Sequence, residues 1–505
     1  MSNGKICVSV CAKTADELTL KIRRAEKFAD VIELRFDCLA RNEVRKALAN
    51  LPSIKKQYLI TFRPKNQGGM REIKIGEQLK FWERVFWALE PGFMIDIELD
   101  PKLLLTINPE KTTRIVSYHD FSGHPENMCL NWDALSSLAG NIVKIAIQAD
   151  DITDSIPVWK LLENARIYNK QIIPIAMGEA GKWTRILGLA HGAFMTYASL
   201  ITGNETAPGQ ISAEDLIDVY RVRKLDEKTA VYGIIGGNTS YSVSPFMHNA
   251  AFKKSNLNSV FVPLQVKNLD EFMGRMVKAE TREIELNFAG FSVTIPHKQA
   301  ILKHLDFIDE TARKIGAVNT VKIENGKFYG FNTDAYGFIE PLKNKFGDLQ
   351  NARVAVFGAG GAARACIYAL QGEGADVSLL ARDPQKADVL AGDFGIAIMQ
   401  LTTDNRQLTT GFDIIVNATP LGTKGAAENE TIADAEQLEG VKLVYDLVYN
   451  PGETRLIREA KAAGILTLGG LEMLVEQGAK QFEIWSGQTA PVGEMTAAVR
   501  KRLIL

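Results

Sequence analysis

The sequence predicts an α/β protein in which an N-terminal (β/α)8 barrel precedes a second α/β half that contains a Rossmann-type unit. In the first half, short apolar segments alternate with amphipathic helical stretches. Repeated β-α units favour a parallel sheet, because a parallel return needs a crossover connection. In the second half, an apolar strand runs into a glycine-rich turn that opens a helix. A chain of 505 residues is long enough for two or three domains.

Eight predicted strands in the first half share runs of β-branched and aromatic residues, at 5–12, 30–38, 58–64, 93–99, 113–121, 141–149, 171–178 and 194–200. Helical patterns lie between them, for example at 14–29 and 156–168. A final helix is expected at 212–222, with Ser212 as its N-cap. Eight such units favour a closed barrel, and an open doubly wound sheet is the alternative.

Composition excludes several classes of protein. Hydrophobic residues make up 46% of the chain and charged residues 24%, and the net charge is −1. This balance predicts a globular protein, and it lacks the basic patch of a nucleic-acid or membrane-surface binder. No apolar run is long enough to span a bilayer, and we interpret the first apolar run as a strand rather than a signal peptide. The oligomeric state is not indicated.

The cysteine pattern predicts a cytoplasmic protein. The five cysteines show neither a CxxC pair nor a Cys/His ligand spacing, so we expect reduced core thiols and no metal site. They are Cys7, Cys11, Cys38, Cys129 and Cys366.

The strand at 141–149 contains a lysine among residues that are otherwise apolar. On the β period, Lys144 shares a face with Ile142 and the small Ala146. Inside a barrel the amine would lose hydration, which lowers its pKa, and a neutral amine can form an imine with a ketone. The alternatives are an ion pair with Glu33 or Glu98, or a side chain that points outward between helices.

Other polar residues also fall late in their strands, where a barrel of this kind carries its chemistry. They are Glu33, Arg35, Arg63, Asp96, Glu98 and His119.

Five motifs over about residues 5–222 resemble type I 3-dehydroquinate dehydratase. They are VIELRFD, TFRP, YHDF, VKIA and TAPGQI, in this order. The resemblance implies that Lys144 forms an imine with the C3 ketone of dehydroquinate, and that the iminium is the electron sink for loss of the C2 proton. It also implies that His119 moves this proton and assists departure of the C1 hydroxyl as water.

The resemblance further implies a set of substrate contacts. Glu33 would accept hydrogen bonds from ring hydroxyls, and the guanidinium groups of Arg35, Arg63 and Arg185 suit a carboxylate, with Arg185 as the main clamp. The remaining substrate contacts would come from Ser9, Thr206 and Gln210.

One position departs from the family pattern. The chain reads RPKNQGG at 63–69, so that Gln67 replaces a glutamate that would assist His119. Glutamine can orient a neighbour but cannot hold a proton or a negative charge. We therefore expect a working dehydratase that is slowed or shifted in its pH dependence. Asp96 or Glu98 could replace the missing carboxylate, and loss of activity in this half is the remaining alternative.

A charged linker places the boundary between the halves near residues 222–229. A strand, a glycine-rich turn and a helix that starts near Pro245 follow it. Ser242 and Ser244 precede this helix, either as caps or as hydroxyls that face a polyol or a carboxylate.

The segment 353–370 has the pattern of a dinucleotide site. A strand ends at Gly358, Gly360 and Ala363, in a G-x-G-x-x-A turn suited to a pyrophosphate at the start of a helix. After the next strand, Arg382 and Lys386 offer two cations for a 2′-phosphate, which favours NADP(H), although an acidic residue, Asp383, lies between them. Segments 413–422 and 442–452 would continue the sheet.

Further motifs over about residues 230–505 resemble shikimate dehydrogenase: SVSP, FAGFSVTIPHK, IGAVNTV, YGFNTDAYG, GAGGAAR and GLEMLVEQGAKQFE. The resemblance implies that Lys298 and Asp334 form a catalytic pair beside the C3 carbonyl. NADPH would give the hydride, Lys298 would donate or relay the proton, and Asp334 would keep Lys298 charged. A structural ion pair is the alternative.

The same resemblance assigns the binding residues of this half. Substrate contacts would come from Ser242, Ser244, Thr294, Asn319, Tyr449, Gln477 and Gln481. Cofactor contacts would come from Gly358, Ala359, Gly360, Gly361, Ala362, Ala363, Arg382, Lys386, Asn417 and Thr419, with Leu447 and Gly470 near the nicotinamide. No catalytic role is expected for His248, His297 or His304.

The two resemblances predict a barrel at 1–222, a substrate lobe at 229–335, a Rossmann lobe at 336–475 and a last helical segment, 476–505, that returns to the substrate lobe. They predict consecutive reactions, dehydration of 3-dehydroquinate and NADPH-dependent reduction of 3-dehydroshikimate to shikimate. Two alternatives are a quinate-preferring dehydrogenase with a weakened dehydratase half and a metabolite-binding regulator, for which Gln67 is the only support.

Overall fold

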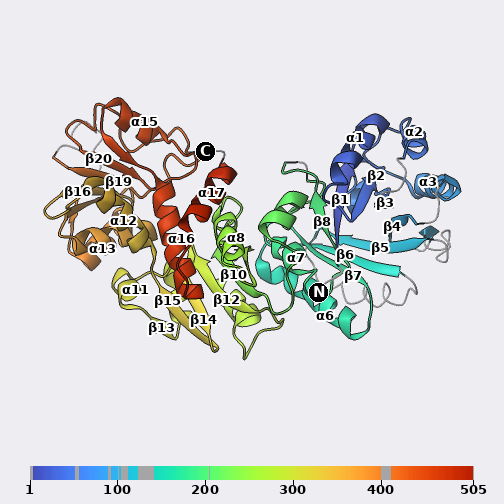
Figure 1. Cartoon of the computed structure of the whole chain (residues 1–505), viewed down its shortest axis with the longest axis horizontal. Helices are drawn as coiled ribbons and strands as arrows, with labels where there is room; N and C mark the ends of the chain where they lie inside the picture. Colours follow the sequence, from blue (N-terminus) through green and yellow to red (C-terminus); the bar gives the residue numbers. More distant parts are fainter. Residues whose placement is uncertain are drawn as a thin grey trace. The chain divides into compact units, whose positions relative to one another are not determined.

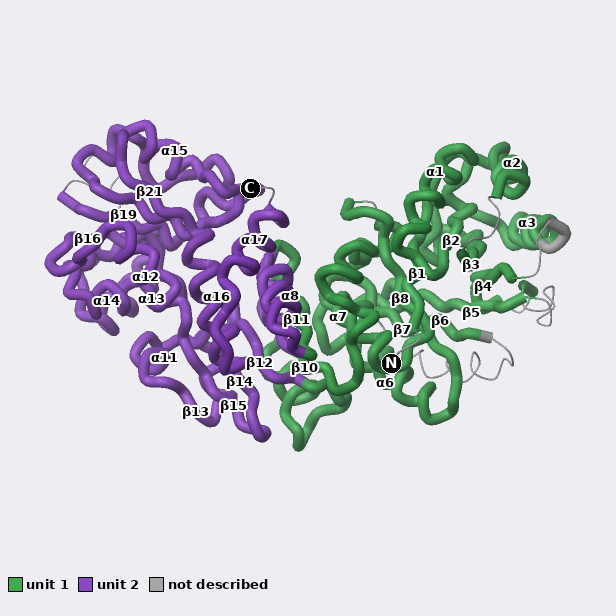
Figure 2. The backbone as a smooth tube through the Cα atoms, in the orientation of Figure 1, with its two compact units in different colours: residues 1–231, 238–241, 258–287 green, residues 232–237, 242–257, 288–505 purple. Residues whose placement is uncertain are grey.

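The computed structural model describes residues 4–51, 56–88, 92–100, 102–103, 112–122, 141–203, 205–399 and 411–503. The chain forms two compact units (Figure 2). Unit 1 contains residues 1–231, 238–241 and 258–287, and unit 2 contains residues 232–237, 242–257 and 288–505. Within the described residues, no helix has the length and apolar character needed to cross a membrane.

Unit 1 is built around a curled parallel sheet with the strand order β7-β6-β5-β4-β3-β2-β1-β8-β9 (Figure 1). The strands are β1 Lys5–Cys11, β2 Val31–Arg35, β3 Gln57–Thr61, β4 Met94–Glu98, β5 Thr113–Asp120, β6 Asn141–Gln148, β7 Ile172–Met177, β8 Met195–Ser199 and β9 Ile211–Ser212. The backbone N–H of Phe194, just before β8, donates to the carbonyl of Ile172 in β7 at 2.8 Å. The predicted strands and the barrel are confirmed, and the open-sheet alternative is wrong.

Helices lie between and after these strands in the chain. They are α1 Ala15–Ala25, α2 Val44–Ala49, η1 Lys65–Gln67, α3 Ile75–Ala88, η3 Ile152–Ser155, α6 Ile156–Ile167, α7 Lys182–Leu187 and η4 Asp215–Val219. The hydroxyl of Ser212 accepts from the backbone N–H of Asp215 at 3.1 Å, so the predicted N-cap is confirmed. Unit 1 also holds β11 Ser259–Gln265, α9 Leu269–Phe272 and η5 Met273–Val277.

The interior of the barrel has an apolar layer followed by a polar layer. Cys7, Val31, Leu59, Met94 and Ile142 belong to one buried cluster at the start of their strands. Because strand side chains alternate, the residue two positions later on each strand faces the same interior. The second layer therefore consists of Ser9, Glu33, Thr61, Asp96 and Lys144, which are all buried. This polar layer lies toward the carboxyl ends of the strands.

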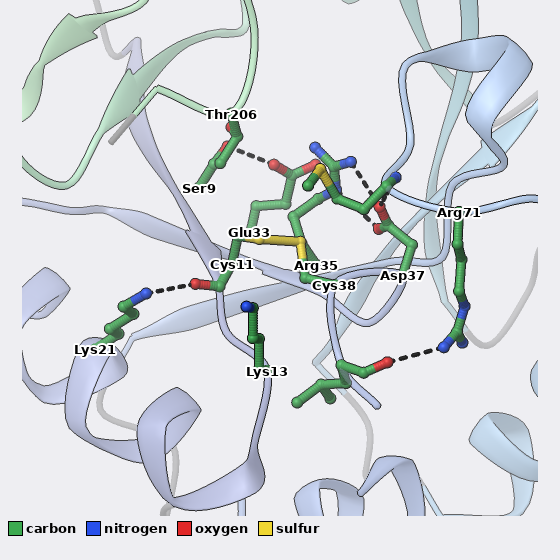
Figure 3. Close-up of a disulfide and its surroundings, with 12 residues drawn as sticks. Ser9, Cys11, Lys13, Lys21, Glu33, Arg35, Asp37, Cys38, Arg71 and Thr206 are labelled. Carbon is green, nitrogen blue, oxygen red and sulfur yellow. Dashed lines mark hydrogen bonds and ion pairs between the residues drawn. A yellow bond between two sulfur atoms is a disulfide. The ribbon is translucent and has the colours of Figure 1, made fainter. Parts of the chain in front are cut away.

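The cysteine prediction is wrong for one pair. Cys11, at the end of β1, and Cys38, in the turn after β2, form a disulfide with a Cα–Cα distance of 5.5 Å (Figure 3). Their pairing follows from strand register, because Cys11 lies directly beside Arg35, three residues before Cys38. Cys7 and Cys366 are free and buried, as expected, and Cys129 lies outside the described residues.

Unit 2 contains two sheets (Figure 1). In the first, the order is β10, β12, β14, β15 and β13, with bounds β10 Ala230–Gly236, β12 Phe288–Val293, β13 Phe307–Ile308, β14 Thr320–Glu324 and β15 Lys327–Phe331. The second is parallel, with the order β18-β17-β16-β19-β20-β21. Its strands are β16 Arg353–Phe357, β17 Asp376–Leu380, β18 Ala397–Ile398, β19 Ile414–Asn417, β20 Leu443–Asp446 and β21 Leu466–Leu468.

The helices of unit 2 are α8 Ser244–Lys254, α10 His297–Ala300, η6 Ile301–His304, α11 Glu310–Ile315, α12 Asp334–Phe346, α13 Gly361–Gly372, α14 Pro384–Phe394, α15 Arg455–Ala462, α16 Gly470–Ser486 and α17 Val492–Leu503. Helix α16 is anchored to the first sheet, where the indole N–H of Trp485 donates to the carbonyl of Val321 at 3.0 Å. The parallel second sheet and its flanking helices confirm the predicted Rossmann-type unit.

Candidate active sites

A cavity with an empty volume of about 520 Å³, which includes the open solvent at its mouth, lies at the polar end of the barrel. Every residue that the first resemblance assigns lines this cavity: Ser9, Glu33, Arg35, Arg63, Gln67, His119, Lys144, Arg185, Thr206 and Gln210. The side chain of Tyr197, from β8, also lines it.

Lys144 is buried inside the barrel, with only 4% of its surface exposed. Its Nζ donates to Oδ2 of Asp96 at 2.8 Å and lies 4.1 Å from the centre of the Tyr197 ring. Burial lowers the pKa of Lys144, and the nearby Asp96 opposes this shift. The partner of the amine is therefore neither Glu33 nor Glu98, and the side chain does not point outward.

The two carboxylates of β4 have different protonation properties. Burial disfavours the charge of Asp96, but Arg63, at 2.7 Å, and Lys144 outweigh it and lower the pKa of this carboxyl. Burial raises the pKa of Glu98 to about 7, and Gln78 donates to its Oε2 at 3.0 Å. Asp96 therefore stays a permanent negative charge beside the amine, whereas Glu98 titrates near neutrality.

His119 faces cations rather than a carboxylate. Nη1 of Arg63 lies 2.8 Å from its Nδ1 and 2.7 Å from its Nε2. Burial lowers the pKa of His119 well below its usual range, and the charges of Arg63, Lys144 and Arg35 add to this effect. The imidazole is therefore neutral at pH 7 and can act as a base. Among the described residues, no carboxylate contacts its ring.

Gln67 belongs to a tight turn beside His119. Its Oε1 accepts from the backbone N–H of His119 at 3.3 Å, so it contacts the strand rather than the ring. The turn requires glycine, because a Cβ on Gly69 would lie 1.9 Å from the carbonyl oxygen of Arg63. Neither candidate replacement, Asp96 or Glu98, contacts the histidine ring in the described part of the chain.

Arg185 provides the strongest anion-binding feature of the cavity. Its side chain is buried, and Nε and Nη1 have no hydrogen-bond partner among the described residues, while Nη2 donates to the carbonyl of Pro208 at 3.3 Å. Burial lowers the pKa of this guanidinium to about 10. A buried guanidinium with unused donors that lines a cavity is suited to a carboxylate ligand.

The remaining cavity residues are held by one another. Glu33 accepts from the hydroxyls of Ser9 and Thr61. The backbone N–H of Thr206 donates to Oε1 of Gln210 at 2.8 Å, which closes the TAPGQI segment on itself. These contacts fix polar groups at the rim of the cavity before any ligand binds.

In unit 2, Lys298 and Asp334 form the predicted pair, with Nζ and Oδ2 2.5 Å apart. The other oxygen of Asp334 accepts from the side-chain amide of Asn319 at 2.8 Å. Asp334 is the first residue of α12, where a carboxylate also benefits from the helix dipole. The pair is therefore oriented on a rigid element.

The two glutamines of α16 differ in their contacts. Oε1 of Gln477 accepts from Asn319 at 3.3 Å, next to Asp334. The amide of Gln481 is already engaged by the protein, because it donates to the carbonyl of Asn319 at 3.2 Å and to Thr320 at 3.0 Å. Its Oε1 accepts from Ser292 at 2.7 Å and contacts the buried His248 at 3.2 Å. The contacts of Gln481 thus anchor Asn319 and the start of β14.

The glycine-rich turn lies against the Lys298–Asp334 pair. Gly358 has a φ of 116°, which favours glycine, and α13 begins three residues later. A Cβ on Gly361 would lie 3.2 Å from Cδ of Lys298. Leu447 and Gly470 are also adjacent, since a Cβ on Gly470 would lie 2.1 Å from the carbonyl oxygen of Leu447. A dinucleotide in the turn formed by Ala359, Gly360, Gly361, Ala362 and Ala363 would therefore approach Lys298.

Arg382, just after β17, and Lys386, in the first turn of α14, are both exposed, and a 2′-phosphate would lie there. The carboxylate of Asp383 is the N-cap of α14, accepts from the backbone N–H of Lys386 at 3.3 Å and lies 3.4 Å from its Nζ. This acidic residue is thus used by the protein itself, which agrees with a site for NADP(H).

The other predicted residues of unit 2 lie at element ends. The hydroxyl of Ser242 accepts from the backbone N–H of Ser244, the first residue of α8, at 3.2 Å. Asn417 accepts from the hydroxyl of Thr419 at 2.6 Å at the end of β19. Thr294 follows β12 and Tyr449 follows β20.

Sequence reasoning missed two residues of the barrel site, Tyr197 and Asp37, and it named Asp96 without identifying it as the partner of Lys144. The position of Tyr197 and the pairing of Asp96 with Lys144 both follow from strand register. Asp96 could have been found because it lies on the same interior face of the barrel as Leu59 and Ile142 of neighbouring strands. Asp37 holds the guanidinium of Arg35 through two hydrogen bonds, at 2.9 Å and 2.7 Å. No sequence signal identified Asp37 beyond its place in VIELRFD.

The fold and the two sites define a two-function metabolic enzyme, in which a lyase barrel with a buried amine is joined to a nicotinamide-dependent oxidoreductase. Comparison with known families agrees with this class. Residues 6–227 match the model of type I 3-dehydroquinase, and residues 234–321 match the shikimate dehydrogenase substrate binding domain. Residues 340–448 match the shikimate / quinate 5-dehydrogenase model, and residues 470–500 match the shikimate 5′-dehydrogenase C-terminal domain.

The chain belongs to the family of bifunctional 3-dehydroquinate dehydratase/shikimate dehydrogenases. It is 35% identical to the chloroplastic bifunctional enzyme of Arabidopsis thaliana over 96% of this chain and 82% of the relative. It is 40% identical to the shikimate dehydrogenase (NADP(+)) of Methanocaldococcus jannaschii over 54% of this chain and 98% of the relative. A crystal structure of a shikimate dehydrogenase in complex with NADP+ matches with a TM-score of 0.50 at 40% identity, over 55% of this chain and 97% of that chain.

Proposed function

We propose that the residues described above carry out the two reactions of this family, dehydration of 3-dehydroquinate and reduction of 3-dehydroshikimate with NADPH. The observation that carries this proposal is the environment of Lys144, an amine buried between Asp96 and Tyr197 in a cavity that also contains the unpaired donors of Arg185. A buried amine next to an anion site is what a ketone that carries a carboxylate requires.

In the dehydratase site, the substrate carboxylate binds Arg185, and its ring hydroxyls contact Glu33 and neighbouring polar groups. The neutral amine of Lys144 attacks the C3 carbonyl, and loss of water gives the imine. The neutral imidazole of His119 removes the C2 proton, and the electron pair moves into the iminium. The same proton then reaches the C1 hydroxyl, which leaves as water, and hydrolysis of the imine releases 3-dehydroshikimate and the free amine.

In the dehydrogenase site, NADPH supplies the hydride when it is bound against the Gly358–Ala363 turn. Lys298 donates a proton to the oxygen that becomes the new hydroxyl. Asp334 orients Lys298 through their ion pair, and Asn319 fixes the orientation of Asp334. Arg382 and Lys386 hold the 2′-phosphate. Ser242, Ser244, Thr294, Tyr449 and Gln477 contact the substrate, and Gln481 acts through Asn319.

We propose the domain division 1–222, 229–335, 336–475 and 476–505, which the ranges of the matching family models support. The absence of nucleic-acid and membrane partners stays a prediction from composition. A cytoplasmic location stays a prediction from the cysteine pattern, in which Cys11 and Cys38 are the exception because they form a disulfide. The small-molecule substrates follow from the family.

The test is to supply the whole chain with 3-dehydroquinate and NADPH and to identify shikimate by mass. Lys144→Ala should abolish shikimate formation from dehydroquinate but not from dehydroshikimate, and Lys298→Ala should let dehydroshikimate accumulate. NADP reduction by shikimate and by quinate, compared side by side, separates shikimate from quinate preference. Binding of dehydroquinate with no turnover in the unmodified chain would support the regulator alternative instead.

A further inference from the structure

The Cys11–Cys38 disulfide lies near residues that line the dehydratase cavity, among them Ser9, Glu33 and Arg35, although neither cysteine lines the cavity itself (Figure 3). It joins the end of β1 to the turn after β2, across a sequence separation of 27 residues. Both cysteines of the disulfide are half-buried, whereas the free Cys7 and Cys366 are buried. In the described residues this is the one disulfide.

A short chain of contacts connects the disulfide to a substrate-binding residue. Cys38 directly follows Asp37, a buried carboxylate that takes two hydrogen bonds from the guanidinium of Arg35 and one from the backbone N–H of Met70 at 3.1 Å. Burial disfavours the charge of Asp37, but Arg35 outweighs it and keeps the pKa of this carboxyl below its usual value. Arg35 lines the cavity, so the position of Asp37 fixes the direction in which the guanidinium of Arg35 points.

Weaker ties hold the rest of this turn. The backbone N–H of Ala40 donates to the carbonyl of Lys13 at 3.0 Å, and the guanidinium of Arg71 donates to the carbonyl of Leu39 at 2.8 Å. These bonds keep the turn close to β1 when the covalent bond is broken. Reduction should therefore leave the barrel folded but give the Asp37 turn more freedom, since the covalent restraint at Cys38 is gone.

We propose that Cys11–Cys38 is a redox modification site for a dithiol reductant, whose reduction loosens the Asp37–Arg35 pair and weakens substrate binding by the barrel. This inference rests on the proposed dehydratase function. The oxidised form is the tight-binding form, and the dehydrogenase site in unit 2 has no part in the change.

The step is an ordinary thiol–disulfide exchange. One thiolate of the reductant attacks a sulfur of the pair, the Cys11–Cys38 bond breaks and a mixed disulfide forms. The second thiol of the reductant displaces the remaining cysteine, so that the reductant becomes a disulfide. Two electrons and two protons pass to the protein, which then carries two thiols.

The experiment compares the full chain after mild oxidation and after treatment with excess dithiothreitol. Alkylation in denaturant followed by mass spectrometry should find two fewer alkylated thiols in the oxidised sample and a cross-link between the Cys11 and Cys38 peptides. We expect the dehydratase KM to be about three- to tenfold higher in the reduced sample, with a smaller change in kcat. The dehydrogenase activity of the same chain is the internal control and should not change.

Cys11→Ser and Cys38→Ser variants should each show the KM of the reduced chain and no response to dithiothreitol. Equal KM values in the two redox states, or oxidised protein without the cross-link, would overturn the inference and leave the dehydratase assignment intact. Absence of dehydratase activity in both states, with dehydrogenase activity present, would overturn the proposed function of the barrel itself.

Discussion

The amine of Lys144 lies 2.8 Å from the carboxylate of Asp96, and both side chains are buried in the interior of the barrel. Two opposing effects act on the protonation of the Lys144 amine. Burial favours the neutral, nucleophilic amine, and the carboxylate favours the ammonium. The carboxylate also pairs with Arg63, which limits its effect on the amine. The lysine can therefore lose its proton without leaving an unpaired charge on Asp96.

The first prediction concerns this pair. Asp96→Asn removes the charge that opposes deprotonation of Lys144, so the pKa of the amine should fall further. Reductive trapping of the imine should then extend to lower pH than in the unmodified chain. The variant also leaves Arg63 without its partner and should lose about 3–5 kcal/mol of stability. An unchanged pH dependence of trapping in folded protein would show that Asp96 does not control the amine.

The second prediction concerns Gln67. In Gln67→Glu, a carboxylate beside His119 should raise the pKa of the imidazole toward its usual value, because it offsets Arg63. His119 must be neutral to act as a base, so the acidic limb of the kcat/KM profile should move to higher pH. A Gln67→Met variant, of similar size and without charge, is the control. If the two variants give the same profile, the charge at this position does not act on His119.

The third prediction concerns Arg185. Arg185→Met should raise the dehydratase KM by about tenfold to a hundredfold, since one charge-assisted contact to a carboxylate contributes about 1.5–3 kcal/mol. Arg185→Lys keeps the charge but loses the paired donors of the guanidinium. Its dehydratase KM should therefore lie between those of the unmodified chain and Arg185→Met. Steady-state kinetics with dehydroquinate measure the effect. A similar loss of dehydrogenase activity would indicate general unfolding instead of a lost carboxylate contact.

The fourth prediction concerns cofactor choice in unit 2. Arg382→Ala should raise the KM for NADPH by about tenfold and leave the KM for NADH nearly unchanged, because only NADPH carries the 2′-phosphate. The control is Arg353→Ala, an exposed arginine at the start of β16, which pairs with the start of β17 and is therefore at the opposite edge of the sheet from Arg382. Equal effects on NADPH and NADH would place the 2′-phosphate elsewhere.

The fifth prediction concerns stability at acidic pH. Burial lowers the pKa of His248 to about 3, so the folded chain stays unprotonated at pH values where the unfolded chain binds a proton. Stability is therefore lost as pH falls below about 6.5, by about 1.4 kcal/mol per pH unit for this group. The full chain is unfolded in urea at about pH 7 and at about pH 5, and loss of dehydrogenase activity reports the unfolding of unit 2. The difference in stability between the two pH values should be smaller in His248→Gln. The same pH effect in both proteins would exclude His248 as its source.

Sequence patterns predicted the barrel because apolar segments alternate with amphipathic helical stretches in eight β-α units. Ser9, Glu33 and Lys144 each follow an interior apolar residue by two positions, and this period is visible without a structure. Motif matches predicted which of these side chains share a cavity. The partner of Lys144 was not predicted, because Glu33, Asp96 and Glu98 all satisfy the strand period and only the full arrangement of strands and side chains selects among them.

The sequence also did not predict which side chains meet across neighbouring strands. Cys11 and Cys38 have no motif spacing, and they meet because β1 and β2 pair with Cys11 opposite Arg35. Gln481 was assigned to the substrate by resemblance, yet its amide is occupied by Ser292, Asn319 and Thr320. Such contacts depend on how α16 packs on the sheet, which a local pattern does not contain.

The most direct test of the central claim is borohydride reduction of the full chain in the presence of 3-dehydroquinate, followed by peptide mass spectrometry. The account predicts a stable adduct on the peptide that contains Lys144, and none in Lys144→Ala. Bound dehydroquinate without an adduct, or an adduct on another lysine, would contradict it.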